Sequence, residues 1–173
     1  PYRDDWNAID PNIIVDEDGC PWMNFGSFWN GMKMFRMTDD LSAVAQPEEW
    51  ITLSKRQRTW TLDDKDPGDG AVEAPFIFKK GDWYYLFVSF DYCCRGKEST
   101  YKVVVGRSDD VKGPYLDKDG VPMTQGGGSL VIEGDGDKWQ AIGHNSAYTF
   151  NGKDYFVAHA YEMTQGTPHL VIR

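Results

Sequence analysis

Three ionisable residues occur at the same place in a repeated pattern of the chain. Asp10, Glu73 and His144 each stand directly before a run of strand-forming residues, at intervals of 63 and 71 residues. Pro11 and Pro75 follow shortly after the two acids and hold the chain extended there. If the three runs fold alike, the three side chains point into one shared cavity.

Two carboxylates that face one cavity are the usual equipment for hydrolysing a glycosidic bond. One carboxylic acid donates its proton to the leaving oxygen, and the second carboxylate activates water or attacks the sugar. Partial burial and a neighbouring negative charge both raise the pKa of such an acid, which keeps it protonated near neutral pH. The pattern is equally compatible with a structural interpretation, in which Asp10 caps a turn, Glu73 is solvated and His144 is a packed histidine.

The residues around these positions have the period of β-strands rather than that of helices. Three segments each predict a strand, a turn that contains Gly and a second strand, namely 11–28, 74–90 and 146–161. A further strand is predicted after each hairpin, in 31–38, 101–108 and 168–173. The one modest helix candidate is 47–57, which reads equally well as loop and strand, and 54–70 and 117–140 are predicted as long loops.

Repeated antiparallel units of this size predict an all-β fold, the β-propeller, in which no blade buries its faces alone. The first strand of each blade lines the central channel, which would bring the three ionisable residues to one end of it. We expect blades at approximately 8–70, 71–140 and 141–173. Because propellers contain roughly four to eight blades, we expect the remaining blades in a longer chain or in a second chain.

Composition narrows the class of partner. The 173 residues include 27 acidic and 18 basic ones, a formal net charge of −9, which argues against a nucleic-acid or anionic-membrane partner. No apolar run approaches the ~20 residues that span a membrane. No signal peptide is visible, although the sequence does not begin with Met. The seven Trp, nine Tyr and nine Phe suit a packed core, and aromatic rings at loop tips are also the usual platforms for sugars.

The three cysteines, Cys20, Cys93 and Cys94, form neither a disulfide framework nor a zinc motif. The adjacent pair Cys93–Cys94 is unusual. The favoured prediction is two packed or free thiols, and the other interpretation is a strained vicinal disulfide that shapes the loop.

Four segments, in this order, resemble the arabinanases of glycoside hydrolase family 43: "NAIDPNIIVDEDG", "FGSFWNGMKMF", "EAPFIFKKGDWYYLFVSFDYCCRGKESTYKVVVGRS" and "IGHNSAYTFNGKDYFVAHAY". The resemblance covers nearly the whole chain, and the combination is more specific than any one motif. It implies a five-bladed β-propeller with its active site in a cleft across the channel mouth, of which this chain holds about the last three blades. It also implies an endo-acting α-1,5-L-arabinanase with an inverting mechanism and three carboxylates.

The resemblance also assigns roles to single residues. Glu73 matches the general acid, and Asp10 matches the aspartate that positions this acid and modulates its pKa. His144 matches a histidine near the axis that helps to hold a central ion, commonly calcium, largely through water. The matching segments that border the sugar subsites contain Asn7, Ser27, Phe28 and Trp29.

One part of the family pattern has no counterpart in this sequence. The general base of the family is an aspartate of the first blade, and neither Asp4 nor Asp5 matches its motif. Residues 1–173 alone are therefore expected not to complete the hydrolysis of arabinan or an arabino-oligosaccharide. The resemblance implies an extracellular or periplasmic protein. The alternatives are an exo-acting arabinofuranosidase or β-xylosidase on the same fold, or a non-catalytic carbohydrate-binding propeller.

Overall fold

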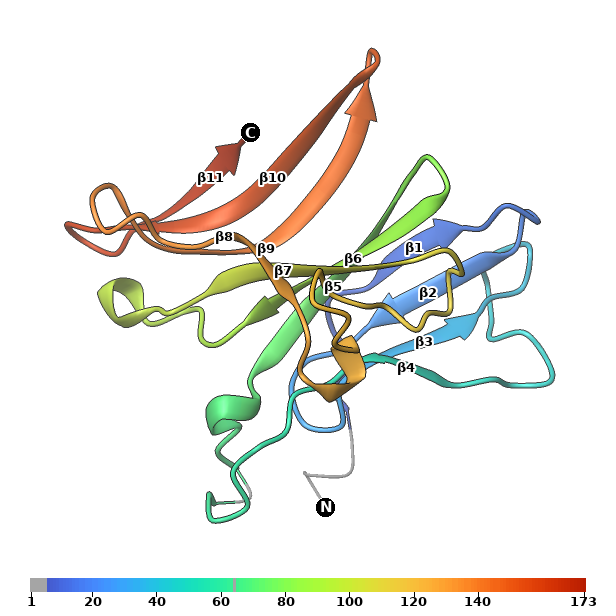
Figure 1. Ribbon diagram of the computed structural model, residues 1–173, viewed down its shortest axis with the longest axis horizontal. Coiled ribbons are helices and arrows are strands. Elements are labelled where there is room, and N and C mark those ends of the chain that lie inside the picture. Colours follow the sequence, from blue (N-terminus) through green and yellow to red (C-terminus); the bar gives the residue numbers. More distant parts are fainter. Residues whose placement is uncertain (1–5, 64) are drawn as a thin grey trace.

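The chain forms three separate antiparallel sheets that follow one another along the sequence (Figure 1). The computed structural model describes residues 6–63 and 65–173. Each sheet is a meander, because strands that are neighbours in sequence are also neighbours in the sheet. All of the paired strands are antiparallel. The predicted all-β fold class is therefore confirmed.

The first sheet contains β1 (Asn12–Val15), β2 (Pro21–Phe25), β3 (Met32–Arg36) and β4 (Ile51–Ser54), in this order. The tight turn between β1 and β2 contains the predicted Asp-Gly pair. One carboxylate oxygen of Asp16 accepts hydrogen bonds from two backbone N–H groups of this turn. The side chain thus supplies the acceptors that the turning backbone lacks.

The second sheet contains β5 (Val72–Lys80), β6 (Trp83–Phe90), β7 (Lys102–Ser108) and β8 (Ser129–Ile132). Two short 3-10 helices lie in its connections, η2 (Gly96–Glu98) and η3 (Met123–Gln125). A third, η1 (Gly68–Gly70), lies between β4 of the first sheet and β5. None of the helices in the described ranges has the length and apolar character that crossing a membrane requires.

The third sheet contains β9 (Trp139–Phe150), β10 (Lys153–Glu162) and β11 (Pro168–Ile172). Its first hairpin turns at Asn151 and Gly152, which both have positive φ angles, 49° and 75°. A two-residue turn with two positive φ angles matches the twist of the strands, and Asn-Gly is the pair that adopts it most easily. The Asn-Gly pair therefore predicts this hairpin, because the turn requires two residues that tolerate positive φ angles.

The structure decides one open prediction in favour of its loop-and-strand alternative and corrects another. The weak helix candidate 47–57 forms a loop and β4, because β4 pairs with β3 at the edge of the first sheet. The predicted loop 117–140 contains η3, β8 and the start of β9. β8 is a four-residue edge strand, and so short a segment gives little periodicity from which to predict it.

The three inner strands β1, β5 and β9 share a local backbone feature. Asp10, Ala74 and His144 have positive φ angles of 56°, 54° and 47°. Two residues after each of them lies a residue that is paired with the second strand of the same sheet. These paired residues are Asn12, Phe76 and Ser146. The structural equivalents are thus Asp10, Ala74 and His144. Glu73 stands one residue earlier, inside β5, so the sequence-based register was wrong by one residue at this position.

The main hydrophobic core lies between the first and second sheets. It combines fully buried residues such as Met34 and Leu53 of the first sheet with Leu86 and Val88 of the second. A smaller cluster lies beneath the third sheet and includes Trp139, Ile142, Ala158, Ala160 and Val171. Removal of this apolar surface from water favours the packing of each sheet on the next.

Candidate active site

The structure brings the predicted residues Asp10, Glu73 and His144 together at the inner strands. The carboxylate Oδ1 of Asp10 lies 4.0 Å from Nε2 of His144. The charge of Glu73 acts on Asp10 as well. The left-handed backbone at Asp10 and His144 is rare for residues other than Gly, and such strained positions concentrate at functional sites.

Hydrogen bonds fix the carboxyl group of Glu73 on both oxygens. Oγ of Ser27 lies 3.0 Å from Oε2 and donates to it. The hydroxyl of Tyr101 donates to Oε1. Cys93 lies close enough to this carboxyl group for its charge to raise the pKa of the thiol. A group held from several sides loses little further freedom when it reacts, which is what an acid catalyst requires.

Asp10 is in a different electrostatic environment from an exposed acid. Burial raises the pKa of Asp10 above its usual value, the charge of Glu73 raises it further, and His144 and the backbone N–H of Ala74 act in the opposite direction. The side chain of Asp10 is only 16% exposed, whereas that of His144 is 50% exposed. Asp10 is thus the more enclosed member of this pair.

The predicted sugar-binding segment forms a sharp corner next to the acid. Ser27 is buried, and its carbonyl oxygen accepts a hydrogen bond of 3.1 Å from Nδ2 of Asn7. Phe28 and Trp29 both have positive φ angles, 60° and 42°. The N–H of Phe28 donates to the carbonyl oxygen of Val72 over 2.6 Å. The corner therefore anchors Ser27 beside Glu73, and two aromatic residues follow Ser27 in the chain.

Cys93, the first of the two adjacent cysteines, lies near Glu73. Cys93 and Cys94 are free thiols, as the favoured prediction states. Burial and the neighbouring Cys94 raise the pKa of the Cys93 thiol far above its usual value, and Glu73 contributes to this effect. The N–H of Cys94 donates to the hydroxyl oxygen of Tyr161 over 2.8 Å, which ties this loop to the third sheet.

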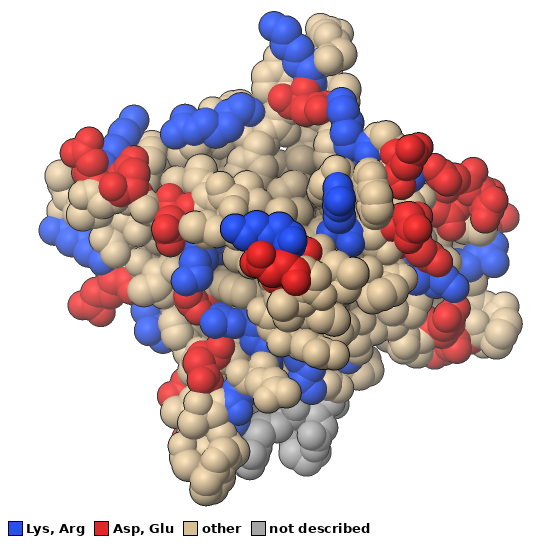
Figure 2. Space-filling view, in the orientation of Figure 1, with Lys and Arg blue, Asp and Glu red and all other residues tan. Residues whose placement is uncertain are grey.

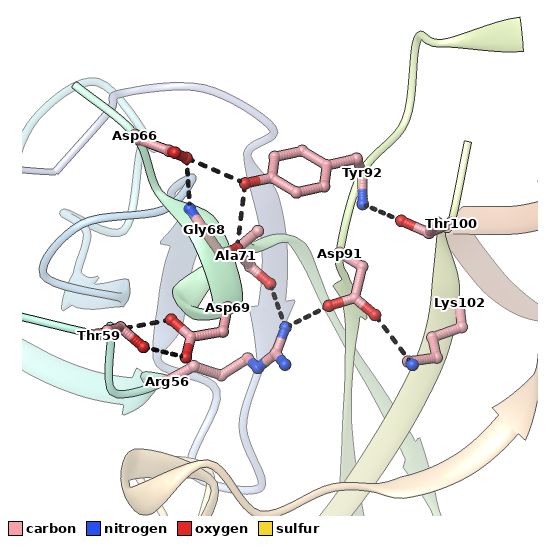
Figure 3. A network of polar contacts seen from close by, with 10 residues as sticks. All are labelled: Arg56, Thr59, Asp66, Gly68, Asp69, Ala71, Asp91, Tyr92, Thr100 and Lys102. Atoms are coloured by element: carbon pink, nitrogen blue, oxygen red, sulfur yellow. Dashed lines mark hydrogen bonds and ion pairs between the residues drawn. The ribbon is translucent and has the colours of Figure 1, made fainter. Parts of the chain in front are cut away.

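A polar network supports the chain just before Glu73 (Figure 3). The guanidinium of Arg56 donates to the carbonyl oxygen of Ala71 over 2.8 Å and to Oδ1 of Asp91 over 2.7 Å. Lys102 pairs with the other oxygen of Asp91 at 2.9 Å. Ala71 lies two residues before Glu73, so the network fixes the entry of the chain into the site.

Sequence reasoning missed Tyr101 and Ser89, which are among the most buried polar residues near the site. They are 1% and 0% exposed. In the sequence, each lies at the end of a strand-forming run and is indistinguishable from an ordinary core or strand residue. The "STYK" segment around Tyr101 drew attention only as part of the family resemblance.

The described residues contain no group of three His, Cys, Asp or Glu side chains arranged to bind a metal directly. A calcium ion prefers oxygen ligands, so His144 would contact such an ion through water. The half-exposed imidazole fits that role. On the face shown in Figure 2, uncharged residues cover most of the surface, and Lys and Arg side chains are scattered among Asp and Glu side chains.

The sheets and the site together define a class of protein. Consecutive antiparallel sheets, whose inner strands bring two carboxyl groups and a histidine together, are the features of a glycosidase with a β-propeller fold. Residues 1–172 match the family described as "Glycosyl hydrolases family 43". The chain therefore belongs to glycoside hydrolase family 43.

Relatives within this family are named for activity on arabinan or its fragments. An extracellular exo-α-(1→5)-L-arabinofuranosidase, ArbA of Cellvibrio japonicus, is 57% identical over 162 residues, which cover 94% of this chain and 46% of the relative. An extracellular endo-α-(1→5)-L-arabinanase 1 of Bacillus subtilis is 38% identical over 168 residues, which cover 96% and 47%. The chain thus spans about half the length of the curated relatives it matches.

Solved structures agree with this relationship. The structure of Cellvibrio cellulosa α-L-arabinanase complexed with arabinohexaose matches with a TM-score of 0.92 and 54% identity, covering 99% of this chain and 55% of that one. The family 43 endo-arabinanase of Bacillus licheniformis matches with a TM-score of 0.82 and 40% identity, covering 97% and 53%.

Proposed function

We propose that the full-length protein hydrolyses α-1,5-linked L-arabinofuranosyl bonds of arabinan or arabino-oligosaccharides, with Glu73 as the general acid. The observation that carries this proposal is the Glu73 carboxyl group, which hydrogen bonds from Ser27 and Tyr101 hold beside Asp10. The names of the related enzymes support the choice of substrate.

In the proposed mechanism, Glu73 gives its proton to the oxygen of the leaving sugar as the glycosidic bond breaks. A second carboxylate takes a proton from a water molecule, which attacks the anomeric carbon from the opposite face and inverts its configuration. We assign this base to no residue within 1–173, and Asp4 and Asp5 lie outside the described residues. Asp10 keeps the acid in position.

We propose that aromatic side chains of the corner contribute to sugar binding. Trp29 lines a hollow of about 510 Å³ together with Trp60, whose side chain is largely exposed. Indole rings stack on the apolar faces of sugars, and Lys55 and Arg58 of the same hollow offer hydrogen-bond donors to hydroxyl groups. Asn7 acts less directly, because it holds the carbonyl group of Ser27.

The architecture and the central ion belong to the same proposal. The three sheets would be blades of a five-bladed propeller, with the remaining blades supplied by a longer chain or by a second chain. Calcium would lie on the axis, held through water by His144. The family relatives that are named extracellular support a secreted location.

A second candidate function is exo-acting release of single arabinose units. It is favoured by the 57% identity to an enzyme named as an exo-arabinofuranosidase. Digestion of linear arabinan separates the two, because an exo enzyme releases small products from the first minutes whereas an endo enzyme first produces long fragments.

The test of the proposed function compares the full-length protein with its Glu73→Gln variant on linear arabinan. Loss of the acid should lower kcat by about 10²–10⁴-fold, measured as the release of reducing ends. A Glu98→Gln variant is the control, since Glu98 is an exposed acid in η2. Equal rates for Glu73→Gln and wild type would refute the assignment, and binding of arabinan without any hydrolysis by the wild type would favour a non-catalytic propeller.

A further inference from the structure

Lys33 of β3 is a buried lysine to which the described residues present no carboxylate. The residue is only 6% exposed, and its Nζ donates to Oγ1 of Thr52 over 2.8 Å. The ammonium group also lies 5.7 Å from the centre of the Trp6 ring. None of the ion pairs within residues 6–63 and 65–173 includes Lys33. Lysine is almost never buried to this extent unless its charge is paired.

The charge of Lys33 is unfavourable in these surroundings. Burial lowers the pKa of Lys33 below its usual value, and the positive charge of Lys55 lowers it further. An ammonium group has three donors, of which the hydroxyl of Thr52 accepts one. Buried charges in proteins are normally paired with a charge of opposite sign. The surroundings of Lys33 therefore favour contact with a carboxylate that lies outside the described residues.

Lys33 lies on the face of the first sheet that points away from the second sheet. Its cross-strand partners are Phe25 on β2 and Thr52 on β4, and Phe35 follows two residues later in β3. Paired residues, and residues two apart in a strand, share one face of a sheet. Met34, the next residue along β3, belongs to the core between the first and second sheets. We call the face with Phe25, Lys33 and Phe35 the outer face of the first sheet.

Aromatic rings cover the outer face next to Lys33. Trp6, Phe25, Phe35 and Trp50 form a cluster in which the centres of neighbouring rings are 5.0 to 5.8 Å apart. These four residues line the apolar hollow of about 390 Å³, and Trp6 and Trp50 are 38% and 44% exposed. Large aromatic residues around a hollow are typical of the centre of a protein contact surface. The outer face therefore combines an apolar contact area with one buried positive charge.

The order of the sheets indicates what covers this face. The first sheet packs on the second, and the second contacts the third, so the next layer beyond the outer face is a sheet that precedes the first one in the chain. Relatives about twice as long have room for such a sheet. We infer that the outer face of the first sheet binds a preceding sheet of the full-length protein, and that this sheet places a carboxylate side chain against Lys33. An entirely apolar layer would enclose the ammonium group without compensating its charge.

The test compares the Tm of the full-length protein with that of its Lys33→Met variant. Met keeps most of the length of the side chain and removes the charge. The change would leave the inferred carboxylate buried without a partner, so we expect Tm at pH 7 to fall by about 5–10 °C. The loss should shrink as the pH falls, because protonation removes the charge of the unpaired acid. Lys118→Met is the matched control, since Lys118 is exposed, and it should keep the wild-type Tm.

Two results of these measurements would overturn the inference. An equal or higher Tm for Lys33→Met at pH 7 would show that no carboxylate contacts Lys33, because removal of an unpaired buried charge does not destabilise a fold. A loss of the same size at every pH would assign the effect to packing instead of charge. A preceding carboxylate also predicts that NMR titration of the full-length protein finds the pKa of Lys33 above 10.5, whereas burial alone keeps it below that value.

A double-mutant cycle identifies the source of the carboxylate. Asp4 and Asp5 lie outside the described residues, and both are changed to Asn in the wild-type and Lys33→Met backgrounds. If the preceding sheet supplies the carboxylate, Lys33→Met should lower Tm by the same amount in both backgrounds. Disappearance of the loss in the Asn background would assign the carboxylate to Asp4 or Asp5 and refute the role of the preceding sheet. These outcomes are independent of Glu73, whose role is measured by kcat on arabinan.

Discussion

The two carboxyl groups of the site, those of Glu73 and Asp10, differ in their hydrogen bonds and in their burial. Glu73 receives hydrogen bonds on both oxygens. Asp10 is mostly buried, and burial is the main cause that raises its pKa. An ionised Asp10 therefore opposes folding, and its presence is better explained by function than by stability.

Replacement of Asp10 by Asn should separate activity from stability. Because the folded-state pKa of Asp10 is raised, the ionised side chain destabilises the fold at neutral pH, and this penalty disappears as the pH falls and the group is protonated. We expect Asp10→Asn to be at least as stable as wild type at pH 7. At acidic pH, where Asp10 is protonated, the two proteins should be equally stable. Activity should fall by about a hundredfold, as for a misplaced catalytic group. Thermal melting at several pH values and kcat on arabinan are the measurements.

Asp10→Ala is the informative companion, because it removes the same charge but places Ala at a φ of 56°. Asn tolerates this backbone conformation better than Ala does. Asp10→Ala should therefore melt below Asp10→Asn at every pH. A marked loss of stability in Asp10→Asn at pH 7 would contradict the view that burial dominates at this position.

At the residue scale, the sequence predicts the ionisable residues of the site and misses the uncharged residues that hydrogen-bond to them. Asp10, Glu73 and His144 were recognisable because ionisable residues recur before strand-forming runs. The sequence pattern did not single out Tyr101 and Ser89, because their hydrogen bonds to Glu73 and His144 depend on which strands become neighbours. The one-residue error at Glu73 has the same origin, since a left-handed residue inside an inner strand cannot be seen in the hydrophobic pattern.

At the element scale, many acidic side chains complete tight turns. Asp16, Asp117 and Asp135 each accept hydrogen bonds from two or more backbone N–H groups that lie two to four residues further along. Hydrogen bonds from the backbone N–H groups of Trp139 and its neighbours lower the pKa of Asp135. Part of the acidic surplus is therefore explained by turn chemistry, which is also why turns and hairpins were the elements best predicted from sequence. β4 and β8 depend on edge pairing and were not.

Asp91 links elements rather than completing a turn, and its loss should weaken the second sheet. Burial acts to raise the pKa of Asp91, but hydrogen bonds from Lys102 and Arg56 outweigh it and lower the pKa below 3.8. The stabilisation is therefore present above that value and is lost as the pH falls through the folded-state pKa. We expect Asp91→Asn to lower the free energy of unfolding at pH 7 by about 2 kcal/mol, with a shrinking difference below pH 3.8.

Urea unfolding at pH 7 and at low pH measures this effect, and Asp119→Asn serves as its control. Asp119 is an acid in the exposed turn 117–120, so its replacement should change stability little at either pH. A constant difference between Asp91→Asn and wild type across the whole pH range would show that the ion pairs are not its cause.

At the scale of the whole molecule, apolar surface remains exposed on the two outer sheets. The third sheet exposes Tyr148, Phe150, Leu170 and Ile172, each by more than half. On the first sheet, Trp6 and Trp50 line an apolar hollow of about 390 Å³. Faces of this kind normally contact another layer, which is consistent with relatives about twice as long. The number of blades stays a prediction.

The proposed calcium ion would act on the whole ring, since an axial ion contacts several blades through water. Removal of calcium from the full-length protein with a chelator should lower Tm by a few degrees, because a ligand that binds only the folded state stabilises it. Re-addition of calcium should restore Tm. In a His144→Gln variant the chelator should have less effect, whereas His169→Gln, an exposed histidine of β11, should behave like wild type. An unchanged melting curve would argue against the ion.

The hydrogen bond between His144 and Ser89 crosses the seam between the second and third sheets. Its length allows almost no separation of the two sheets before it breaks. A slight parting of this seam would separate His144 from Ser89 and Ile142 from Tyr101, while each sheet keeps its own ladder of hydrogen bonds. Warming of the full-length protein should consequently abolish the proposed activity before the sheets unfold, so that this seam sets the upper temperature of that activity.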